Sequence, residues 1–414
     1  MKHRIFKLES KVLHTSRSQL FHGLILFIIY IVNETVSWPL LRLWNVYGSS
    51  SDFIDLRWFW ISARCYNEVG IGIYESKGSF CGGYQYGIFP IKMILKLGIS
   101  ESWVQIIGYS FMMFFCFLMA KYLLPLCSYV LYKKSLFYVV SCSPPFMLMV
   151  QRGQIDLFVT AMAFISIKLS LLQRKSWIFA IISVGLLSLV TVIKIYPILF
   201  LFLIGLLSGK RSFLLTHWIA ILLLLPTLIQ DLSFIPLKIN SAPGGTYMSF
   251  GFLNMATRLS ETQTFELSKS LIMVMSFIVH GIILILLFNF SGRFVNSLSN
   301  LKDLNVNNHS YYIWMSIFLS CYFLGNNIDF RLIFMLLAVV HLCRAAKGSK
   351  DARPILFLAL SNLFLSFQSG GMEFFGDLTV AILAMFLLNC LIWALPKLAV
   401  ELKGILLRPL RHES

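Results

Sequence analysis

Long apolar runs separated by short polar connections make up most of the chain. Most of these runs approach the ~20 residues that a helix needs to cross the hydrocarbon core of a bilayer. They predict about twelve transmembrane helices, at 19–45, 103–125, 135–150, 155–172, 177–193, 196–208, 212–230, 270–290, 311–326, 332–346, 354–370 and 377–396. The pattern therefore predicts an all-α polytopic membrane protein.

One early segment, residues 50–90, departs from this pattern because it contains no clean apolar span. A connection longer than ~15 residues is unusual unless it is functional or disordered, and its many aromatic residues argue against disorder. Residues 56–69 and 90–98 place apolar side chains among charged ones at helical spacing. This spacing is typical of helices that lie in the membrane interface, so we expect two such helices to cover one end of the bundle.

Composition agrees with the membrane class, since 58% of the residues are hydrophobic and the mean hydropathy is +0.78. A net charge of +17 would suggest nucleic acid as the partner of a soluble protein. Here the basic residues lie in short clusters between apolar runs, and Lys and Arg concentrate in cytoplasmic loops. The charge therefore indicates membrane topology and no nucleic-acid partner.

The same charge distribution orients the chain. A cytoplasmic N-terminus places most of the 35 Lys and Arg residues on the inner side. We expect one transmembrane domain over 1–414, with cytoplasmic tails at 1–18 and 397–414, a first external loop at 46–100 and a second at 231–269. In a bacterial cell membrane these loops would face the periplasm.

Common catalytic motifs are absent from the sequence. It contains no Walker motif, GxGxxG, HExxH or GxSxG, and its eight cysteines show no metal-binding spacing. ATP hydrolysis, dinucleotide chemistry, zinc proteolysis and serine hydrolysis therefore lack support. We expect neither a cofactor nor a metal.

Acidic residues of the first external loop provide the first candidate chemistry. A carboxylate such as Asp55, held in a partly water-excluded site at the membrane surface, can act as a general base toward a hydroxyl nucleophile. The structural alternative is that Asp52 caps a helix beginning near Phe53, and that Asp55 is a first-turn acid favoured by the helix dipole. Residue types alone favour this alternative.

Further polar residues lie at the outer ends of apolar runs. Gln154 and Asp156 follow Arg152 at a helix start, where Asp156 either caps the helix or binds sugar hydroxyls. Lys194 ends another run, where it either extends to the surface or points inward to an anionic ligand.

A third group combines charged and aromatic residues. Asp329 and Arg331 form either a plain ion pair at a helix start or a functional pair, because ionisable residues in membrane helices are functional candidates by default. Tyr84 and Tyr86 either line a site or belong to an aromatic belt. His280, on an apolar run, is expected only to find hydrogen-bond partners.

Taken in order, these pieces resemble glycosyltransferase family 87, within the GT-C superfamily of polytopic glycosyltransferases. The family's first loop carries D-x-x-x-aromatic, then G-x-x-x-Y, then an aromatic-x-Tyr pair followed by proline. The matching residues are Asp55 and Phe59, Gly70 and Tyr74, and Tyr84, Tyr86 and Pro90.

The resemblance continues to about residue 215. A Ser-Pro-Pro before a G-Q-x-N helix start is matched by Ser143–Pro145 and by Gly153–Asp156, with Asp in place of Asn. A K-x-x-P pair before a basic inner turn is matched by Lys194 and Pro197. The His-containing outer motif of mannosyl-transferring members is not apparent, so the resemblance does not identify the sugar.

The resemblance implies a GT-C-like bundle and an inverting transfer of mannose, or another hexose or pentose, from a polyprenyl-phosphate sugar. The acceptor would be a glycolipid or cell-surface glycan at the outer face, in contact with membrane lipid. Asp55 would be the base, and Lys194, Arg331 and Arg152 would bind the donor phosphate. Substrate would contact Asp52, Tyr84, Tyr86, Gln154, Asp156 and Asp329.

Two other classes share the helix number. A flippase or other transporter should show paired halves with interrupted helices near the bilayer midplane, and a polysaccharide polymerase would place its large external loop late in the chain. The early loop and the polar residues at outer helix ends favour the transferase.

Cys65 and Cys81 are the two cysteines of the first external loop. Either they form a disulfide, which an oxidising external compartment would preserve, or both are free thiols. A bridge closing a loop of about 15 residues would restrict the unfolded chain by roughly 3 kcal/mol. Alkylation of intact cells distinguishes the two: the bridge predicts that Cys81 reacts only after reduction, whereas a thiol that reacts fully beforehand means no disulfide.

Overall fold

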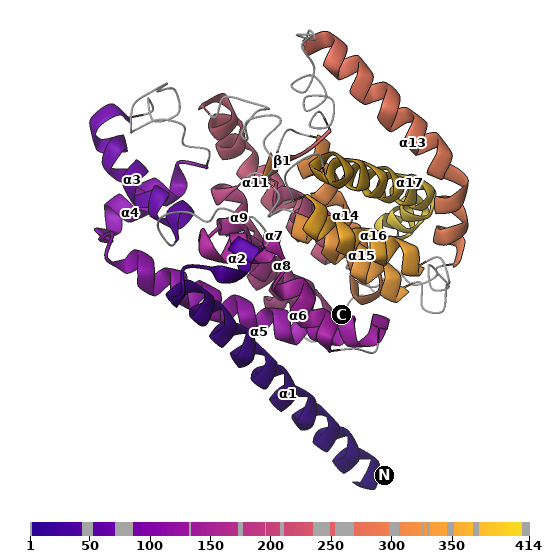
Figure 1. Cartoon of the computed structure of the whole chain (residues 1–414), viewed down its shortest axis with the longest axis horizontal. Helices are drawn as coiled ribbons and strands as arrows, with labels where there is room; N and C mark the ends of the chain where they lie inside the picture. The colour runs from indigo at the N-terminus through magenta and orange to yellow at the C-terminus, as the bar shows by residue number, and fades with distance from the viewer. Residues whose placement is uncertain are drawn as a thin grey trace.

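Helices form nearly all of the part of the chain that the structure, a computed structural model, describes. The described residues are 2–43, 53–70, 86–131, 134–172, 177–194, 196–207, 211–234, 249–252, 269–297, 306–323, 327–328, 332–345, 352–366 and 372–407. The helices are α1 (Lys2–Thr35), α2 (Pro39–Leu43), α3 (Ile54–Val69), α4 (Phe89–Leu97), α5 (Trp103–Leu131), α6 (Ser135–Ser141), α7 (Pro144–Gln151), α8 (Ile155–Leu172), α9 (Ile178–Ile193), α10 (Ile198–Leu207), α11 (Arg211–Phe234), α13 (Lys269–Ser297), α14 (Val306–Phe323), α15 (Leu332–Ala345), α16 (Ala352–Leu365) and α17 (Met372–Leu407) (Figure 1).

Two short strands also occur among the described residues. In β1 (Ser249–Phe250) and β2 (Asn327–Ile328), Ser249 pairs with Ile328 and Phe250 with Asn327 in antiparallel register. The pairing joins a segment between α11 and α13 to the segment that precedes α15.

Several helices have the length and hydropathy of membrane spans. Five of the described helices, α1, α5, α11, α13 and α17, are long and apolar enough to cross a bilayer, and the bent pair α7 and α8 counts as a sixth if it is one span. Shorter apolar helices include α9, α14, α15 and α16. The chain is an all-α membrane protein, and the count of about twelve spans stays a prediction.

The predicted first and third spans differ from the structure. The run 135–150 forms two helices, α6 and α7, because Ser143 adopts the extended backbone that proline imposes on the residue before it. The run 19–45 ends as a helix at Thr35, since Ser37 and Trp38 both have positive φ and Pro39 then begins α2. At the other end, α1 includes residues that were predicted as a cytoplasmic tail.

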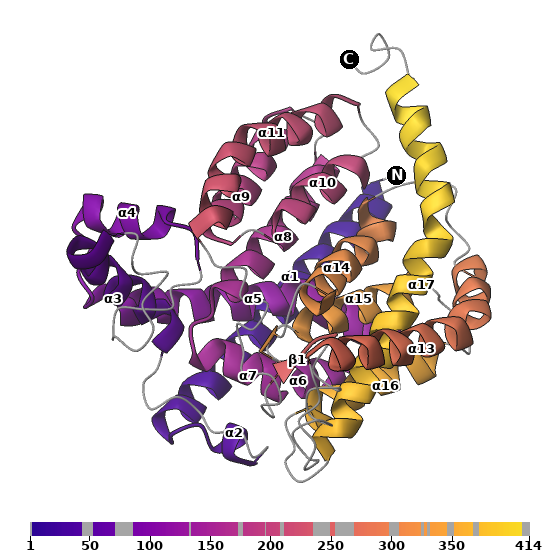
Figure 2. The same ribbon diagram turned by 90° about the horizontal axis from the view of Figure 1, so that it is seen from above.

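The helices of the bundle pack in neighbouring pairs, as Figure 2 shows from above. Helix α1 lies along α5, α8 lies along α9, α14 along α15, and α13 along α17. Both predicted amphipathic helices are present as α3 and α4, which pack on each other at one edge of the molecule. Trp60 of α3 donates its indole N–H to the carbonyl of Ile99, 2.9 Å away, which fixes this pair of helices.

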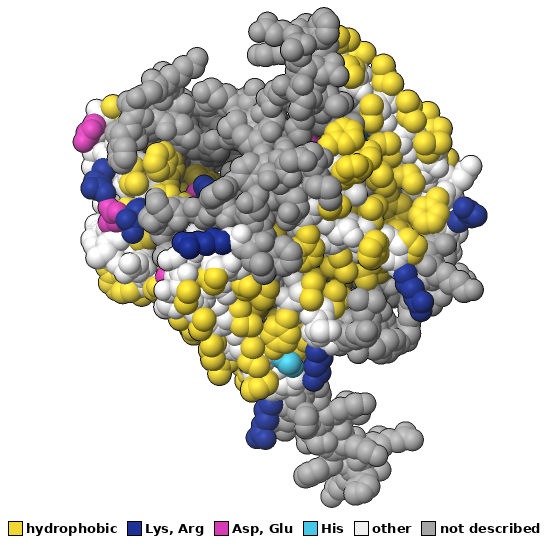
Figure 3. All heavy atoms as spheres, viewed as in Figure 1, with side chains coloured by type: hydrophobic (Ala, Val, Ile, Leu, Met, Phe, Trp, Pro, Cys, Tyr) yellow, Lys and Arg dark blue, Asp and Glu magenta, His cyan; other side chains and the backbone are white. Residues whose placement is uncertain are grey.

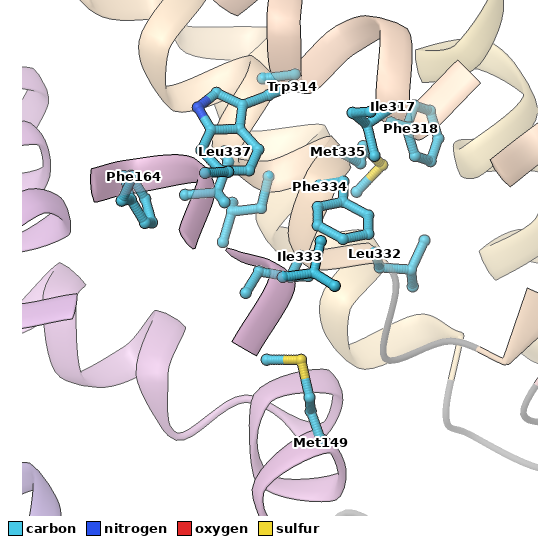
Figure 4. Close-up of a cluster of buried hydrophobic side chains, with 14 of the residues drawn as sticks. Met149, Phe164, Trp314, Ile317, Phe318, Leu332, Ile333, Phe334, Met335 and Leu337 are labelled. Atoms are coloured by element: carbon cyan, nitrogen blue, oxygen red, sulfur yellow. The ribbon is translucent and has the colours of Figure 1, made fainter. Parts of the chain in front are cut away.

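Aromatic packing around Trp314 joins the middle of the bundle (Figure 4). The fully buried Trp314 ring of α14 lies 4.9 Å from the Phe164 ring of α8 and 5.5 Å from the Phe200 ring of α10, measured between centroids. It also stacks on Phe334 of α15. Because protein interiors are close-packed, this cluster fixes the position of α8. The first turn of α8 carries Asp156.

Apolar side chains cover the outer faces of the long helices. On α11, Leu223 is 75% exposed, and on α13, Ile285 and Leu286 are 75% and 74% exposed. Figure 3 shows apolar side chains gathered over α13. Exposed apolar surface of this extent is expected where a helix faces lipid.

Candidate functional site

The helix of the first loop, α3, begins against a sharp corner between α7 and α8. Residues 151–155, named here the α7–α8 corner, join two helices that meet at 108°. The N–H of Phe53 donates to the carbonyl of Gln151 at 2.7 Å, and the N–H of Asp55 donates to the carbonyl of Arg152 at 2.9 Å. The first N–H groups of a helix have no carbonyl partner within the helix. At α3, carbonyl groups of the corner accept these hydrogen bonds.

Asp55 and Arg152 form a two-pronged ion pair at this contact. The Arg152 Nε donates to Asp55 Oδ2 at 2.8 Å, and its Nη2 donates to Oδ1 at 2.7 Å. The Asp55 side chain is 13% exposed and that of Arg152 is 30% exposed. Because two parallel charge-assisted hydrogen bonds fix both distance and angle, the Asp55 carboxylate is held in one orientation.

A second ion pair lies at the start of α8, where Asp156 follows Arg152 by four residues. Lys194 Nζ donates to Asp156 Oδ2 at 2.8 Å, and the Tyr196 hydroxyl donates to Asp156 Oδ1. The Asp156 side chain is fully buried and that of Lys194 is 7% exposed. Lys194 therefore points inward, which was one of the two alternatives that the sequence left open. The anion that it contacts is Asp156, a residue of the chain itself.

Tyr86 lies between the two ion pairs. Its ring centroid is 5.2 Å from Lys194 Nζ and 4.7 Å from the Phe59 ring of α3. The N–H of Gly87 donates to the carbonyl of Ile193 at 3.1 Å, which holds this segment against the end of α9.

Gln154, between the two pairs in sequence, is buried at 3% exposure. Within the described part of the chain, its Oε1 accepts no hydrogen bond. Buried polar atoms normally have a partner, so this oxygen is an unsatisfied acceptor beside the two ion pairs.

The structure brings six of the ten predicted site residues to the α7–α8 corner and its surroundings. They are Asp55, Tyr86, Arg152, Gln154, Asp156 and Lys194. The other four, Asp52, Tyr84, Asp329 and Arg331, lie outside the described residues. Sequence reasoning missed Tyr196, although its place two residues after Lys194 and directly before a proline was a usable signal.

The cluster carries equal numbers of opposite charges, with Asp55 and Asp156 against Arg152 and Lys194. Within the described part of the chain, no three His, Cys, Asp or Glu residues gather where they would bind a metal. The charged groups at the corner can accept a proton on a carboxylate, form hydrogen bonds, and stabilise an anion with a guanidinium.

Other polar candidates lie elsewhere. Cys65 of α3 is disulfide-bonded, and its partner falls outside the described side chains, so its pairing with Cys81 stays a prediction. His280 has the hydrogen-bond partners expected of it, because its Nδ1 contacts the Ser276 carbonyl at 2.6 Å and its Nε2 contacts the Tyr322 hydroxyl.

Comparison of the chain with protein-family models, with curated proteins and with solved structures found no match.

The Asp156–Lys194 pair yields a stability prediction. Lys194→Met keeps the length of the side chain but leaves a fully buried carboxylate without its cation, which costs about 3–5 kcal/mol in comparable pairs. We expect a clear fall in the midpoint of thermal unfolding in detergent, with most of the loss recovered in Lys194→Met/Asp156→Asn. Lys96→Met, at an exposed lysine of α4, is the control and should leave the midpoint unchanged. A midpoint for Lys194→Met equal to that of the wild type would contradict the pairing.

Proposed function

We propose that the protein transfers a sugar from a polyprenyl-phosphate donor to a hydroxyl group of a glycolipid or surface glycan, with inversion at the anomeric carbon. The observation that carries the proposal is the Asp55–Arg152 ion pair. It joins a carboxylate from the first loop to a cation at the broken helix, with both side chains partly exposed. The order of motifs shared with glycosyltransferase family 87 supports the same reaction.

The proposed reaction needs a base, an anion-stabilising group and a pocket that excludes water. The acceptor hydroxyl oxygen attacks the anomeric carbon of the sugar while Asp55 takes the hydroxyl proton. The bond between that carbon and the phosphate oxygen breaks, and the polyprenyl phosphate departs with the bonding electrons. Its negative charge is stabilised by Arg152, and no oxidant, metal or further reactant is required.

Arg152 can serve both roles at once because of its geometry. A guanidinium has five N–H donors, and the contacts with Asp55 use its Nε and one Nη. Each carboxylate oxygen of Asp55 keeps a further lone pair for the acceptor hydroxyl. The pair therefore holds the base beside the phosphate-binding cation, and each group keeps hydrogen-bonding capacity for the substrate.

Lys194 has a different place in this proposal. Its ammonium is buried against Asp156, so its charge is already balanced, and we assign it to holding Asp156 and the start of α8. Arg152, more exposed, is the stronger candidate for the donor phosphate. The unpartnered Oε1 of Gln154 is a candidate acceptor for a sugar hydroxyl, and Tyr86 is a candidate stacking surface. Roles for Asp52, Tyr84, Asp329 and Arg331 rest on the resemblance alone.

We place the site at the outer face of a cell membrane, within a GT-C-like bundle of about twelve spans. Support comes from the excess of basic residues in the connections assigned to the inner side. The disulfide at Cys65 gives independent support, since disulfides persist in oxidising compartments outside the cytosol. Because α3 carries both Cys65 and Asp55, the two residues share a side of the membrane.

A lipid-linked-sugar flippase is the second candidate function, favoured by one observation. Helices α7 and α8 form a sharply bent pair, and discontinuous helices carrying ionisable residues are common in transporters. It is the one such pair within the described ranges. Purified protein in vesicles separates the two functions, since a flippase moves the lipid-linked sugar without forming a new glycosidic bond.

Asp55 yields the central activity prediction. Asp55→Asn preserves the size of the side chain and one hydrogen bond with Arg152 but removes the proton acceptor. We expect sugar transfer to fall at least ~100-fold, within the range that general base catalysis contributes, with normal membrane insertion. Glu101→Gln removes a carboxylate of the same region that pairs with Arg57 and Arg64, and should retain activity. Wild-type transfer by Asp55→Asn would move the base elsewhere.

Arg152 yields a separate prediction on donor binding. Arg152→Gln should weaken binding of a radiolabelled polyprenyl-phosphate sugar in detergent by about 10-fold or more, because hydrogen bonds to charged groups contribute roughly 1.5–3 kcal/mol. Arg64→Gln, which removes an arginine of α3 whose side chain is 69% exposed, is the matched control. Equal donor affinity in wild type and Arg152→Gln would exclude Arg152 from the phosphate site.

A further inference from the structure

A strained phenylalanine lies two residues before the proposed base. Phe53 occupies the N-cap position of α3 with φ 56° and ψ 34°, in the left-handed region that bulky residues rarely adopt. Such a conformation is strained and persists only where the surroundings hold it. Phe53 is 1% exposed, so the contacts of its buried side chain hold the backbone in this conformation.

Two glycines form a slot around the Phe53 side chain. A Cβ atom built on Gly108 of α5 would lie 2.5 Å from the nearest ring carbon of Phe53. One built on Gly153, in the α7–α8 corner, would lie 3.1 Å from the Cβ of Phe53. No side chain fits at Gly108 while the ring stays in place, because real Cβ contacts are never this short.

The slot also joins α3 to the transmembrane helices. The Phe53 ring meets the Tyr109 ring of α5 edge-on, with centroids 5.2 Å apart, and the Tyr109 hydroxyl donates to Glu34 of α1. On its backbone side, Phe53 donates to the carbonyl of Gln151. One residue thus contacts α5 and the α7–α8 corner, two positions before Asp55.

We propose that Phe53, seated between Gly108 and Gly153, is the positioning residue that holds Asp55 against Arg152. This inference rests on the proposed role of Asp55 as the base. The left-handed turn at Phe53 directs the ring into the slot and the first turn of α3 toward the corner. Without the seated ring, the N-terminus of α3 is free to move away, and the carboxylate loses its fixed alignment with Arg152 and substrate.

Gly108→Ala tests the slot with a single methyl group. Alanine favours helix over glycine, so α5 itself is not weakened, and only the seat of Phe53 is lost. Gly281→Ala is the matched control, because Gly281 lies within α13 and a Cβ built there meets nothing within 4 Å. Phe53→Leu in the Gly108→Ala background restores room for the methyl and is the rescue variant.

The first measurement does not depend on enzymatic activity. The N–H groups of Phe53 and Asp55 donate across the contact, so hydrogen exchange of a peptide covering 53–57 reports whether α3 is docked. We expect exchange at least tenfold faster in Gly108→Ala, unchanged exchange in Gly281→Ala, and partial protection in the rescue variant. Unchanged exchange in Gly108→Ala would overturn the proposal.

The second measurement separates positioning from general stability. A misplacement of about 1 Å can lower the rate about 100-fold, so Gly108→Ala should lower kcat 10- to 100-fold with little change in the KM for donor, and the rescue variant should recover part of it. Faster exchange with wild-type kcat would overturn the positioning role. If wild-type protein transfers no sugar, the proposed function fails while hydrogen exchange still decides whether Phe53 docks α3.

Discussion

Charge cannot stand alone in the apolar interior of this protein, and the site is arranged around that constraint. Moving an ionised group out of water costs several kcal/mol unless a partner and hydrogen bonds compensate it. Asp156 is fully buried and has both Lys194 and Tyr196 on its oxygens. Asp55 is less buried and forms its ion pair with Arg152. The deeper pair is therefore shielded from solvent, while the shallower pair remains partly exposed.

The broken helix makes this pairing geometrically feasible. A continuous helix would hydrogen-bond the carbonyls of Gln151 and Arg152 internally, whereas the corner presents them to the first N–H groups of α3. Gly153, at φ +60°, allows the turn. The aromatic cluster at Trp314 packs against α8, and α3 docks on the corner through its first N–H groups.

Local patterns in the sequence predicted the helices well and the contacts between them less well. Helices α8, α9 and α15 fall on predicted apolar runs because hydropathy and period are local properties. The break before Pro144 was masked by a continuous apolar run, although the proline pair signalled it. Residue types alone favoured a helix-dipole role for Asp55, since its partner Arg152 lies 97 positions away. The left-handed Phe53 likewise depends on Gly108 of α5 and Gly153 of the α7–α8 corner, which no local rule connects to it.

We propose that α3 and the α7–α8 corner together form a site for a phosphate-linked sugar. A cryo-electron microscopy structure of the protein in lipid nanodiscs, with a non-hydrolysable polyprenyl-phosphate sugar bound, would show whether they do. We expect the phosphate within hydrogen-bond distance of the Arg152 guanidinium and the anomeric carbon facing Asp55. A ligand bound elsewhere in the bundle, with the Asp55–Arg152 pair untouched, would rule this site out.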